Sequence, residues 1–121
     1  MSRILVVDDN ADTITLLKAM LEKWGFEVIS GHNGEEGLGL VSSAQPDAII
    51  SNLRMPRMDG LTFLKQVRVR SEWASIPFVM MSGLFPEEFG SAALQQGANG
   101  VLAKPFRFTD LSKLIQNLNL S

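Results

Sequence analysis

A small set of polar side chains stands directly after short apolar runs, at positions where such groups could act together. The set comprises two adjacent carboxylates, an amide, a hydroxyl and an ammonium: Asp8, Asp9, Asn52, Ser82 and Lys104. Adjacent carboxylates repel each other, and a Mg²⁺ ion bound through one or both of them relieves that repulsion. An ammonium and a hydroxyl are groups that a phosphoryl oxygen would contact. Together these residue types have the chemistry of a site for a hard cation and a phosphate.

The amide at position 52 limits that chemistry, because it leaves the set without a nucleophile. A carboxylate there would attack phosphorus and form an acyl phosphate, whereas the amide nitrogen of Asn52 has a delocalised lone pair and its oxygen carries no full charge. No neighbour is a convincing substitute. Asp47 lies about 16 Å before residue 52 in an extended chain, Asp59 suits a helix N-cap, and Ser51 points to the opposite face of its strand. Covalent phosphotransfer to residue 52 is therefore not expected.

The elements that must position these groups can be predicted from the hydrophobic pattern. Short apolar runs without strict alternation indicate strands covered on both faces of a parallel sheet, at residues 4–7, 27–30, 48–51, 78–81 and 100–103. Helical spacing predicts helices at residues 12–24, 34–43, 60–69 and 86–96, and a last helix that opens with Thr109 as its N-cap. Gly25 and Gly97 end the first and fourth helices. This alternation predicts an α/β sheet whose polar strand ends meet at one edge, where such sheets bind ligands.

The composition is that of one folded domain spanning residues 1–121. Hydrophobic residues make up 45% and charged residues 20% of the 121 residues, which suits a single core. A net charge of −2 provides no basic field, so direct nucleic-acid binding is not expected. The absence of cysteine, of a signal-peptide pattern and of a membrane-length apolar run favours a cytoplasmic protein. The chain ends at Ser121, soon after the last predicted helix, as an excised domain would.

In order and spacing, the motifs resemble those of the receiver domains of two-component response regulators, over residues 4 to 118. The resemblance rests on Ile4-Leu-Val-Val-Asp-Asp-Asn, Pro46-Asp47, Asn52-Leu-Arg-Met-Pro-Arg-Met-Asp-Gly, Met81-Ser82-Gly83 and Ala103-Lys104-Pro105-Phe106. It implies a flavodoxin-like, doubly wound sheet of five strands in the order 2-1-3-4-5, with five helices. It also implies that Asp8 and Asp9 bind Mg²⁺, that Ser82 is a switch hydroxyl, and that Lys104 contacts phosphate and precedes a cis bond to Pro105.

Two positions depart from the family pattern. Asn52 stands where the family has its phosphorylated aspartate, and Val101 stands where many members have a rotating aromatic switch. The missing acid weakens the Mg²⁺ site, although the amide oxygen of Asn52 can still coordinate the ion. Without phosphate, Lys104 is expected to pair with one of the two adjacent acids. Ser82 suits an ordinary strand-end hydroxyl as well as a switch.

The leading hypothesis is a non-enzymatic signalling receiver that is not phosphorylated at residue 52 and acts through protein contacts. Its partners would be a sensor kinase or an output protein, bound on a face formed by the segment between Pro86 and Gln96, Val101, and the segment between Phe106 and Leu118. The alternative is an ordinary Mg²⁺-dependent phosphoacceptor that carries an Asp-to-Asn substitution. A flavodoxin-like electron carrier is a weaker rival, because the acids after the first strand repel a flavin phosphate. A scaffolding or oligomerisation domain without a ligand is a further rival.

Other residues receive structural interpretations. His32, the single histidine, is predicted to be a solvated turn residue without partners. Four methionines are predicted to pack in the core or its loops, not to ligate a metal: Met55, Met58, Met80 and Met81. Aromatic residues near the expected partner face are predicted to be mostly core, with a partly exposed patch: Phe85, Phe89, Phe106 and Phe108.

Overall fold

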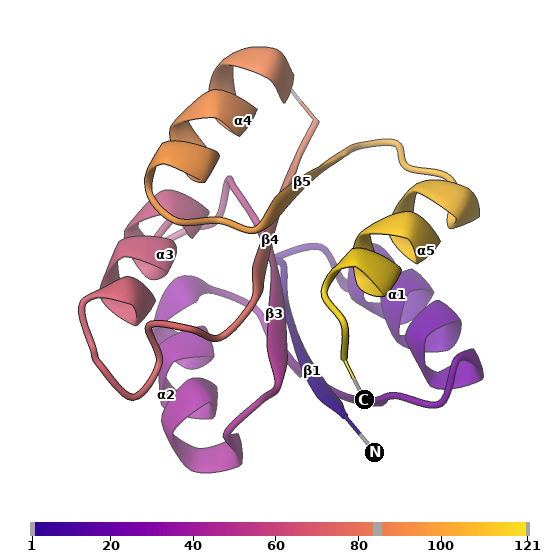
Figure 1. The fold of residues 1–121 in the computed structure, drawn as a ribbon, viewed down its shortest axis with the longest axis horizontal. Helices are drawn as coiled ribbons and strands as arrows, with labels where there is room; N and C mark the ends of the chain where they lie inside the picture. The colour runs from indigo at the N-terminus through magenta and orange to yellow at the C-terminus, as the bar shows by residue number, and fades with distance from the viewer. Residues whose placement is uncertain (1, 84–85, 121) are drawn as a thin grey trace.

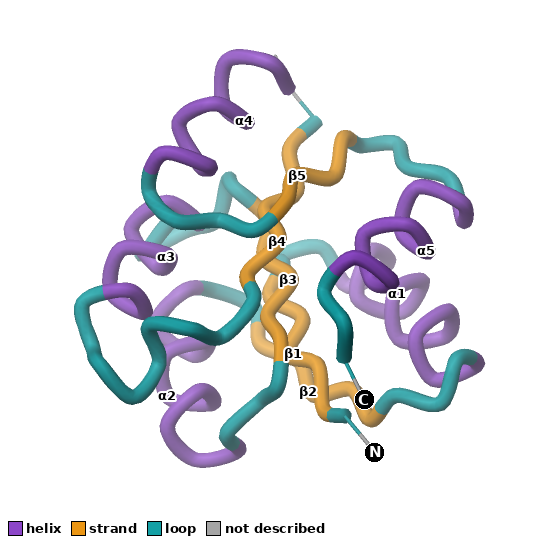
Figure 2. The backbone as a smooth tube through the Cα atoms, in the orientation of Figure 1, coloured by secondary structure: helices purple, strands orange, loops and turns teal. Residues whose placement is uncertain are grey.

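Five parallel strands form the centre of the molecule. The computed structural model describes residues 2–83 and 86–120, and within the fourth helix it describes no side chains for residues 86–90. The strands are β1 (Arg3–Val7), β2 (Glu27–Gly31), β3 (Ala48–Asn52), β4 (Phe78–Ser82) and β5 (Gly100–Ala103). They pair in the order β2-β1-β3-β4-β5, as Figures 1 and 2 show from one side. The predicted doubly wound order is confirmed, and four of the five strands extend one residue beyond the predicted bounds.

Helices cover both faces of the sheet. They are α1 (Ala11–Lys23), α2 (Gly34–Ala44), α3 (Gly60–Arg68), α4 (Pro86–Gln95) and α5 (Phe108–Asn117). Figure 1 shows α1 and α5 on one face and α2, α3 and α4 on the other. Each face has its own apolar cluster, because successive strand residues point to opposite sides. One cluster contains Ile4, Val6 and Leu111, and the other contains Leu5, Val7 and Phe63.

Local polar contacts fix most helix ends. Asn10 and Asn33 cap α1 and α2 by accepting hydrogen bonds from backbone N–H groups. The predicted cap Asp59 is confirmed, since its carboxylate accepts from the N–H of Thr62 at 2.8 Å. Gly25 and Gly97 have φ angles of 93° and 107°, which confirms them as the residues that end the first and fourth helices.

The predicted N-cap of the last helix is wrong. α5 begins at Phe108 and its N-cap is Arg107, two residues before Thr109. The carboxylate of Asp110 reaches back and accepts from the N–H of Arg107 at 2.9 Å. The start of a helix leaves backbone N–H groups without partners, and an N-cap hydroxyl would accept from one of them. Here the carboxylate of an acid in the first turn accepts from the N–H of the N-cap residue instead.

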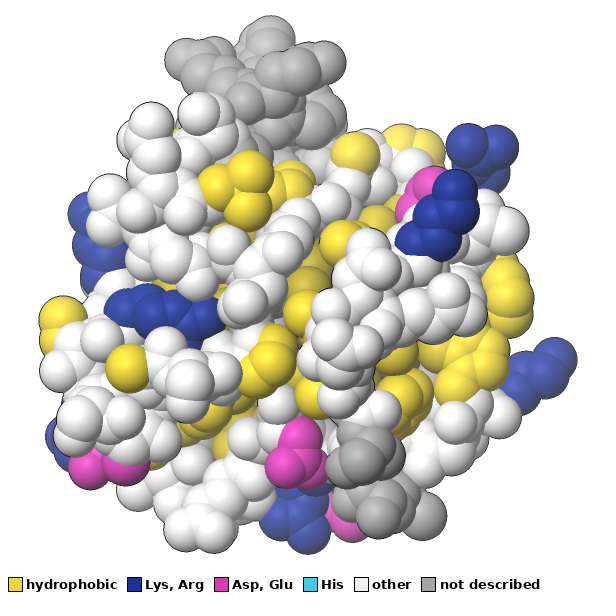
Figure 3. All heavy atoms as spheres, in the orientation of Figure 1, with side chains coloured by type: hydrophobic (Ala, Val, Ile, Leu, Met, Phe, Trp, Pro, Cys, Tyr) yellow, Lys and Arg dark blue, Asp and Glu magenta, His cyan; other side chains and the backbone are white. Residues whose placement is uncertain are grey.

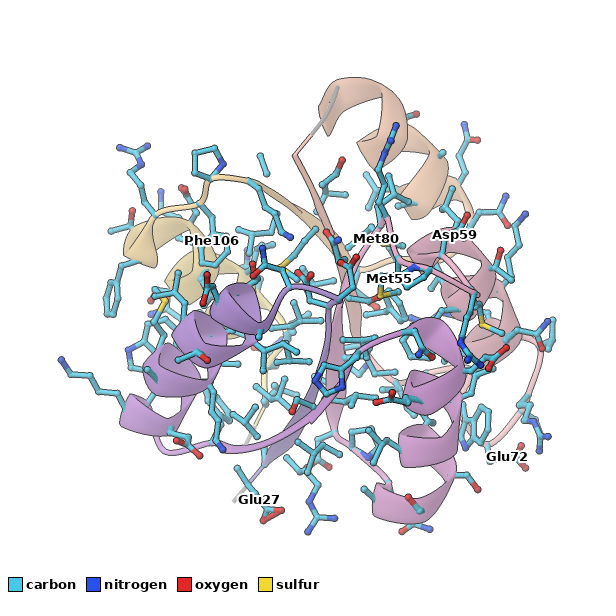
Figure 4. The ribbon with its side chains drawn as sticks, turned by 180° about the vertical axis from the view of Figure 1, so that it is seen from behind. Glu27, Met55, Asp59, Glu72, Met80 and Phe106 are labelled. Atoms are coloured by element: carbon cyan, nitrogen blue, oxygen red, sulfur yellow. The ribbon has the colours of Figure 1, made fainter. Side chains whose placement is uncertain are left out.

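The edge of the sheet where the strands begin is held by a compact ionic network around Arg3. Its backbone N–H donates to Asp47 at 2.7 Å, and its Nε lies 2.6 Å from a carboxylate oxygen of Glu27. Figure 4 shows Glu27 and Glu72 toward this end, and Met55, Met80, Asp59 and Phe106 toward the other. The prediction that Asp47 lies at the wrong end to replace a nucleophile is confirmed by this contact.

A second polar anchor joins α3 to the loop before β5. The guanidinium of Arg68 donates to the carbonyls of Gly97 and Trp73 and to the side-chain oxygen of Asn99, at 3.0, 3.3 and 3.1 Å. Burial lowers the pKa of Arg68 below its ordinary value. Asn99 in turn accepts from the N–H of Phe78 at 2.9 Å, so this anchor positions the start of β4 as well.

The face seen in Figure 3 has no large patch of side chains that carry the same charge. Lysine and arginine side chains there are spread apart, some of them beside acidic ones, with apolar side chains between them. Within the described ranges, 2–83 and 86–120, no helix has the length and apolar character needed to span a membrane.

Candidate functional site

The carboxyl ends of β3, β4 and β5 deliver their polar side chains into one pocket. The pocket has a volume of about 220 Å³ and is lined by Asn52, Leu53, Arg54, Ser82, Gly83 and Lys104. Neighbouring register places Asn52 beside Met81 and Ser82 beside Ala103, so the three strands end at one level. The structure therefore brings together the amide, the hydroxyl and the ammonium that the sequence placed at separate strand ends.

The carboxyl end of β1 joins these residues through an ion pair between Asp8 and Lys104. The Asp8 carboxylate is fully buried, and its Oδ2 lies 2.8 Å from Nζ of Lys104. Its Oδ1 accepts from the N–H of Asn10 at 2.9 Å. Asp9, the next residue, is exposed. Of the two acids expected to pair with Lys104, the buried one does so, because an unpaired buried carboxylate would lose its hydration without compensation.

Asn52 is held in place by its own loop. Its Nδ2 donates to the backbone carbonyl of Arg54 at 2.7 Å. Ser51 is buried and donates to the carbonyl of Asn52 at 3.0 Å, which satisfies its hydroxyl locally. A carboxylate at position 52 would lack the proton for the first of these bonds. The amide therefore fixes the loop after β3 in a way that the family's acid cannot.

The start of α3 packs against the same strand end. The N–H of Gly60 donates to the carbonyl of Leu53 at 2.7 Å. A Cβ at position 60 would collide with the carbonyl oxygen of Asn52 and lie 2.8 Å from the sulfur of Met80. Only glycine permits this approach, so α3 begins in contact with the end of the strand that bears the amide.

The two predicted switch positions are both partly enclosed. Ser82 is 3% exposed at the end of β4 and lines the pocket. Val101 is half-buried on β5 and packs against the apolar cluster under α2, α3 and α4. Its branched aliphatic side chain cannot reproduce the rotation of an aromatic ring, because Val has no ring and a stiff χ1.

A second, mainly apolar groove adjoins the pocket. Thr13 and Leu16 of α1 line it together with Lys104, Pro105 and Phe106, around a volume of about 380 Å³. Leu16 is 51% exposed there. The Lys104–Pro105 peptide bond is cis, as the family resemblance implied. Lys104 lines both hollows and so forms the wall between the polar pocket and this groove.

The donors at the site suit a hard cation only partly. Asp8 supplies one carboxylate, already paired with Lys104, Asp9 is exposed beside it in the sequence, and Asn52 in the pocket lining supplies a neutral amide oxygen. In the part of the chain that the structure describes, no three His, Cys, Asp or Glu side chains are grouped to hold a metal. Magnesium favours oxygen ligands with carboxylates among them. Asp8, Asp9 and Asn52 offer such oxygens, with one negative charge fewer than a site that has a carboxylate at position 52.

His32 is exposed as predicted, but the prediction that it has no partner is wrong. Its Nδ1 lies 3.2 Å from Oε1 of Glu36, and its backbone N–H donates to the same oxygen at 3.1 Å. The backbone hydrogen bond, followed by the ring contact, holds the pKa of Glu36 below its ordinary value. The contact caps the start of α2 and lies outside the residues that line the pocket.

The aromatic and methionine predictions have mixed outcomes. Met80 and Met81 are buried, and Met55 and Met58 pack against the same side of the core as Met80, as predicted. Phe106 is half-buried, whereas Phe108 is 49% exposed and stacks edge-on against Trp24. Phe85 lies outside the described residues, and so does the side chain of Phe89.

Arg54 was missed as a site residue by sequence reasoning. It follows the strand end by two positions, and its guanidinium makes no ion pair with any described residue. It lines the pocket, and its carbonyl accepts a hydrogen bond from Nδ2 of Asn52, a contact that hydrophobic periodicity does not predict. The available signal was a cation two residues after the amide, in a loop that leaves the carboxyl edge of the sheet.

A doubly wound parallel sheet with a polar pocket at its carboxyl edge defines a class of α/β ligand-binding and signalling domains. Comparison with known proteins narrows this class. The profile of the family described as "Response regulator receiver domain" matches residues 4–116, and the chain belongs to this family.

Individual proteins agree with this assignment. The probable chemotaxis protein CheY of Rhizobium etli is 32% identical over 115 residues, which cover 94% of this chain and 89% of that protein. The crystal structure of a putative response regulator from Chloroflexus aurantiacus has a TM-score of 0.93 at 32% identity, covering 97% of this chain and 96% of that one. The receiver domain of a sensor histidine kinase from Pseudomonas aeruginosa has a TM-score of 0.88 at 27% identity, covering 97% and 96%. It was solved with a magnesium ion in its active site cleft.

Proposed function

We propose that this receiver is a signalling module that is not phosphorylated at residue 52 and acts through contacts with other proteins. The observation that carries the proposal is a neutral amide in the pocket lining, together with Ser82 and Lys104. An amide nitrogen is not nucleophilic, so an acyl phosphate cannot form there. No acid within the pocket lining replaces it, since the lining residues include no Asp or Glu.

The remaining site residues keep the roles that the family resemblance implies. Asp8 and Asp9 would hold Mg²⁺, with the Asn52 oxygen as a weak third ligand, and the ion would supply positive charge against the two acids. Lys104 would contact an oxyanion, and Ser82 would act as the switch hydroxyl. Val101 cannot provide an aromatic rotation, so we place this domain's response in backbone and side-chain shifts at the pocket edge. The domain performs no catalysis of its own in this proposal.

Its partners would be a sensor kinase or an output protein, and neither nucleic acid nor a membrane is bound directly. The proposed docking face combines α4, β5 and α5. Leu94 of α4 and Phe108 of α5 are 52% and 49% exposed, and a hollow of about 340 Å³ is lined by Val101, Pro105 and Leu114 among others. Partly exposed apolar side chains beside charged ones suit a transient protein contact. A cytoplasmic location and a single domain over residues 1–121 complete the proposal.

A second candidate function is an ordinary phosphoacceptor receiver in which residue 52 has been changed from Asp to Asn. The intact Asp8–Lys104 pair and the Ser82 hydroxyl in the pocket favour it, because they are the groups that a phosphotransfer site needs. Restoring the acid by Asn52→Asp separates the two possibilities. The matched control is Ser51→Ala, one residue earlier on the opposite face.

The experiment incubates each protein with a small phosphodonor and Mg²⁺ and measures the mass of the intact protein. The unaltered chain and the Ser51→Ala variant are expected to gain no phosphate. Uptake by the Asn52→Asp variant supports an otherwise competent site, and lack of uptake favours a receiver that has lost phosphotransfer altogether. Phosphate attached to the unaltered chain at residue 52 would overturn the main proposal. A flavin chromophore in the purified protein would favour the electron-carrier rival instead.

A further inference from the structure

A separate hollow lies at the edge of the sheet where the strands begin. It has a volume of about 450 Å³ and is lined on one side by residues of the segment 41–46, at the end of α2, and on the other by residues of the segment 70–76, between α3 and β4. Figure 4 shows Glu72, one of its lining residues, at the opposite end of the molecule from Met55 and Met80. The residues that line this hollow, which we call the amino-edge pocket, all differ from those of the polar pocket at the carboxyl edge.

The apolar part of the amino-edge pocket is continuous with the core. Val41 is fully buried, and Trp73 and Ile76 pack against the same apolar cluster. Tight turns hold this part in place, because the N–H of Trp73 donates to the carbonyl of Arg70 at 3.0 Å and the N–H of Ile76 donates to the carbonyl of Trp73 at 3.1 Å. The guanidinium of Arg68 donates to the same Trp73 carbonyl at 3.3 Å. The backbone that carries the indole ring is therefore held before any ligand binds, which lowers the entropic cost of binding.

Two opposite charges line the same pocket. The guanidinium carbon of Arg70 lies 4.7 Å from the centre of the Trp73 ring, a cation–π contact. Its Nη1 lies 3.9 Å from Oε1 of Glu72, which is longer than a hydrogen bond, and both side chains are more than half exposed. A loose, exposed ion pair of this kind contributes little to stability, and each group keeps donors or lone pairs for another partner. The pocket therefore presents one positive and one negative group beside an apolar surface.

We propose that the amino-edge pocket binds a free α-amino acid with an apolar side chain. The carboxylate of the ligand pairs with Arg70, its ammonium pairs with Glu72, and its side chain packs against Val41 and Trp73. In a free α-amino acid both charged groups are bonded to one carbon, so their separation is comparable to the 3.9 Å between the two protein charges, whereas the ends of a peptide lie further apart. The volume falls within the roughly 300–1,000 Å³ of small-molecule sites.

The charges of the pocket exclude simpler ligands. An anion without an ammonium is attracted by Arg70 but repelled by Glu72, and the reverse holds for a cation without a carboxylate. A neutral apolar molecule would leave both charges without a new partner. Only a ligand that carries both signs gains from both residues. This inference does not depend on residue 52 or on the proposed function, because the two sites share no lining residue.

The chain provides a matched control pair of charges. Nη1 of Arg57 lies 3.2 Å from Oε2 of Glu35, and neither residue lines the amino-edge pocket. These side chains are 68% and 56% exposed, close to the 61% and 63% of Arg70 and Glu72. The variants Arg70→Gln and Arg57→Gln therefore remove the same charge from similar surroundings, as do Glu72→Gln and Glu35→Gln. Only the first variant of each pair changes the pocket.

The test is a titration of the full chain with L-leucine, followed by backbone amide NMR at constant ionic strength, because screening alters such affinities. Saturable shifts are expected at Gln45, Glu72 and Trp73, with a midpoint between about 0.1 and 10 mM, and no shift is expected at Gly83 in the polar pocket. Arg70→Gln and Glu72→Gln are each expected to weaken binding about fivefold, the size of one exposed charge pair. The two control variants are expected to stay within about twofold of the unaltered chain.

Derivatives of the ligand test the two charges separately. N-acetyl-leucine keeps only the carboxylate, and leucine amide keeps only the ammonium, so both are expected to bind at least about fivefold more weakly than leucine. Arg70→Gln is expected to weaken binding of N-acetyl-leucine but not of leucine amide, and Glu72→Gln is expected to do the reverse. Trileucine, whose charged ends lie further apart, is expected to bind more weakly than leucine.

Several results would overturn the proposal. It is wrong if the pocket amides show no saturable shift up to about 50 mM leucine, or if the pocket variants and the control variants weaken binding equally. It is also wrong if N-acetyl-leucine or leucine amide binds as tightly as leucine, because recognition of both charges would then be absent. Tighter binding of trileucine would refute the assignment to a free amino acid. The derivative series uses the unaltered chain, so it decides the matter even if a variant is unstable.

Discussion

The buried ion pair between Asp8 and Lys104 gives the most direct test of how the site is built. Changing Lys104→Met keeps the length and apolar stem of the side chain but removes its charge. The Asp8 carboxylate, fully buried, would then retain only the N–H of Asn10 as a donor among the hydrogen bonds that the structure shows for it. The unfolding free energy is expected to fall, because a buried charge without a counter-ion is costly.

The magnitude follows from the geometry. At 2.8 Å and an effective dielectric constant of about 20, the attraction between the two charges is about 6 kcal/mol before any desolvation cost. Lys104 is 23% exposed, so water replaces part of its contribution, and the Asn10 N–H remains. Removing one partner of a buried pair typically costs 3–5 kcal/mol, and we expect about 2–4 kcal/mol here.

The assay is urea denaturation of a double-mutant cycle with Lys104→Met, Asp8→Asn and the double variant. The double variant is expected to recover most of the loss, with a coupling energy of at least about 2 kcal/mol. Lys113→Met, an exposed lysine of α5 without an ion pair among the described residues, is the control and should change stability by less than about 0.5 kcal/mol. If the two single changes add within about 0.5 kcal/mol in the double variant, the pair does not act as a buried ion pair.

Three further changes test other parts of the structure. Gly60→Ala should cost at least about 2 kcal/mol in urea denaturation and shift the amide resonance of Asn52, because the new Cβ meets that residue's carbonyl. Arg68→Lys should cost about 1–3 kcal/mol, since an ammonium cannot reproduce three spread hydrogen bonds, and an unchanged midpoint would refute the anchor. Glu36→Gln should lower the melting temperature at pH 7 but not at pH 3. The lowered pKa of Glu36 stabilises the fold above its ordinary value of 4.5, and this contribution disappears as the pH falls through the lowered pKa; an equal difference at both pH values would contradict the contact with His32.

Most of the fold was predictable because its signals are repetitive. Each strand is a short apolar run between helices with a clear stripe, and two glycines with positive φ mark helix ends that the sequence alone identified. The start of α5 was not predictable in the same way. Thr109 has the better capping side chain. The N-cap is nevertheless Arg107, because the carboxylate of Asp110 accepts from the backbone N–H of Arg107. A cap depends on the direction from which the chain arrives, which is set by tertiary packing.

The site likewise has features that the sequence predicted and features that it did not. Convergence of Asn52, Ser82 and Lys104 followed from parallel strands ending at one edge, and the structure places all three in one pocket. Which of Asp8 and Asp9 pairs with Lys104 depends on how deeply each acid is buried, and the sequence does not reveal that difference. Roles such as Mg²⁺ binding and switching stay predictions, because they concern ions and partners rather than the folded chain alone.

The network around Arg3 has a practical consequence for anyone who engineers this domain. Its contacts lie at the edge where the strands begin, about five residues of strand, or roughly 16 Å, from the polar pocket. Thermal robustness can therefore be raised or lowered by redesigning this network while the polar pocket is left alone. The carboxyl edge differs, because Lys104 pairs with the buried Asp8 and, in the proposed function, would also contact the ligand, so a substitution at Lys104 is expected to alter both properties.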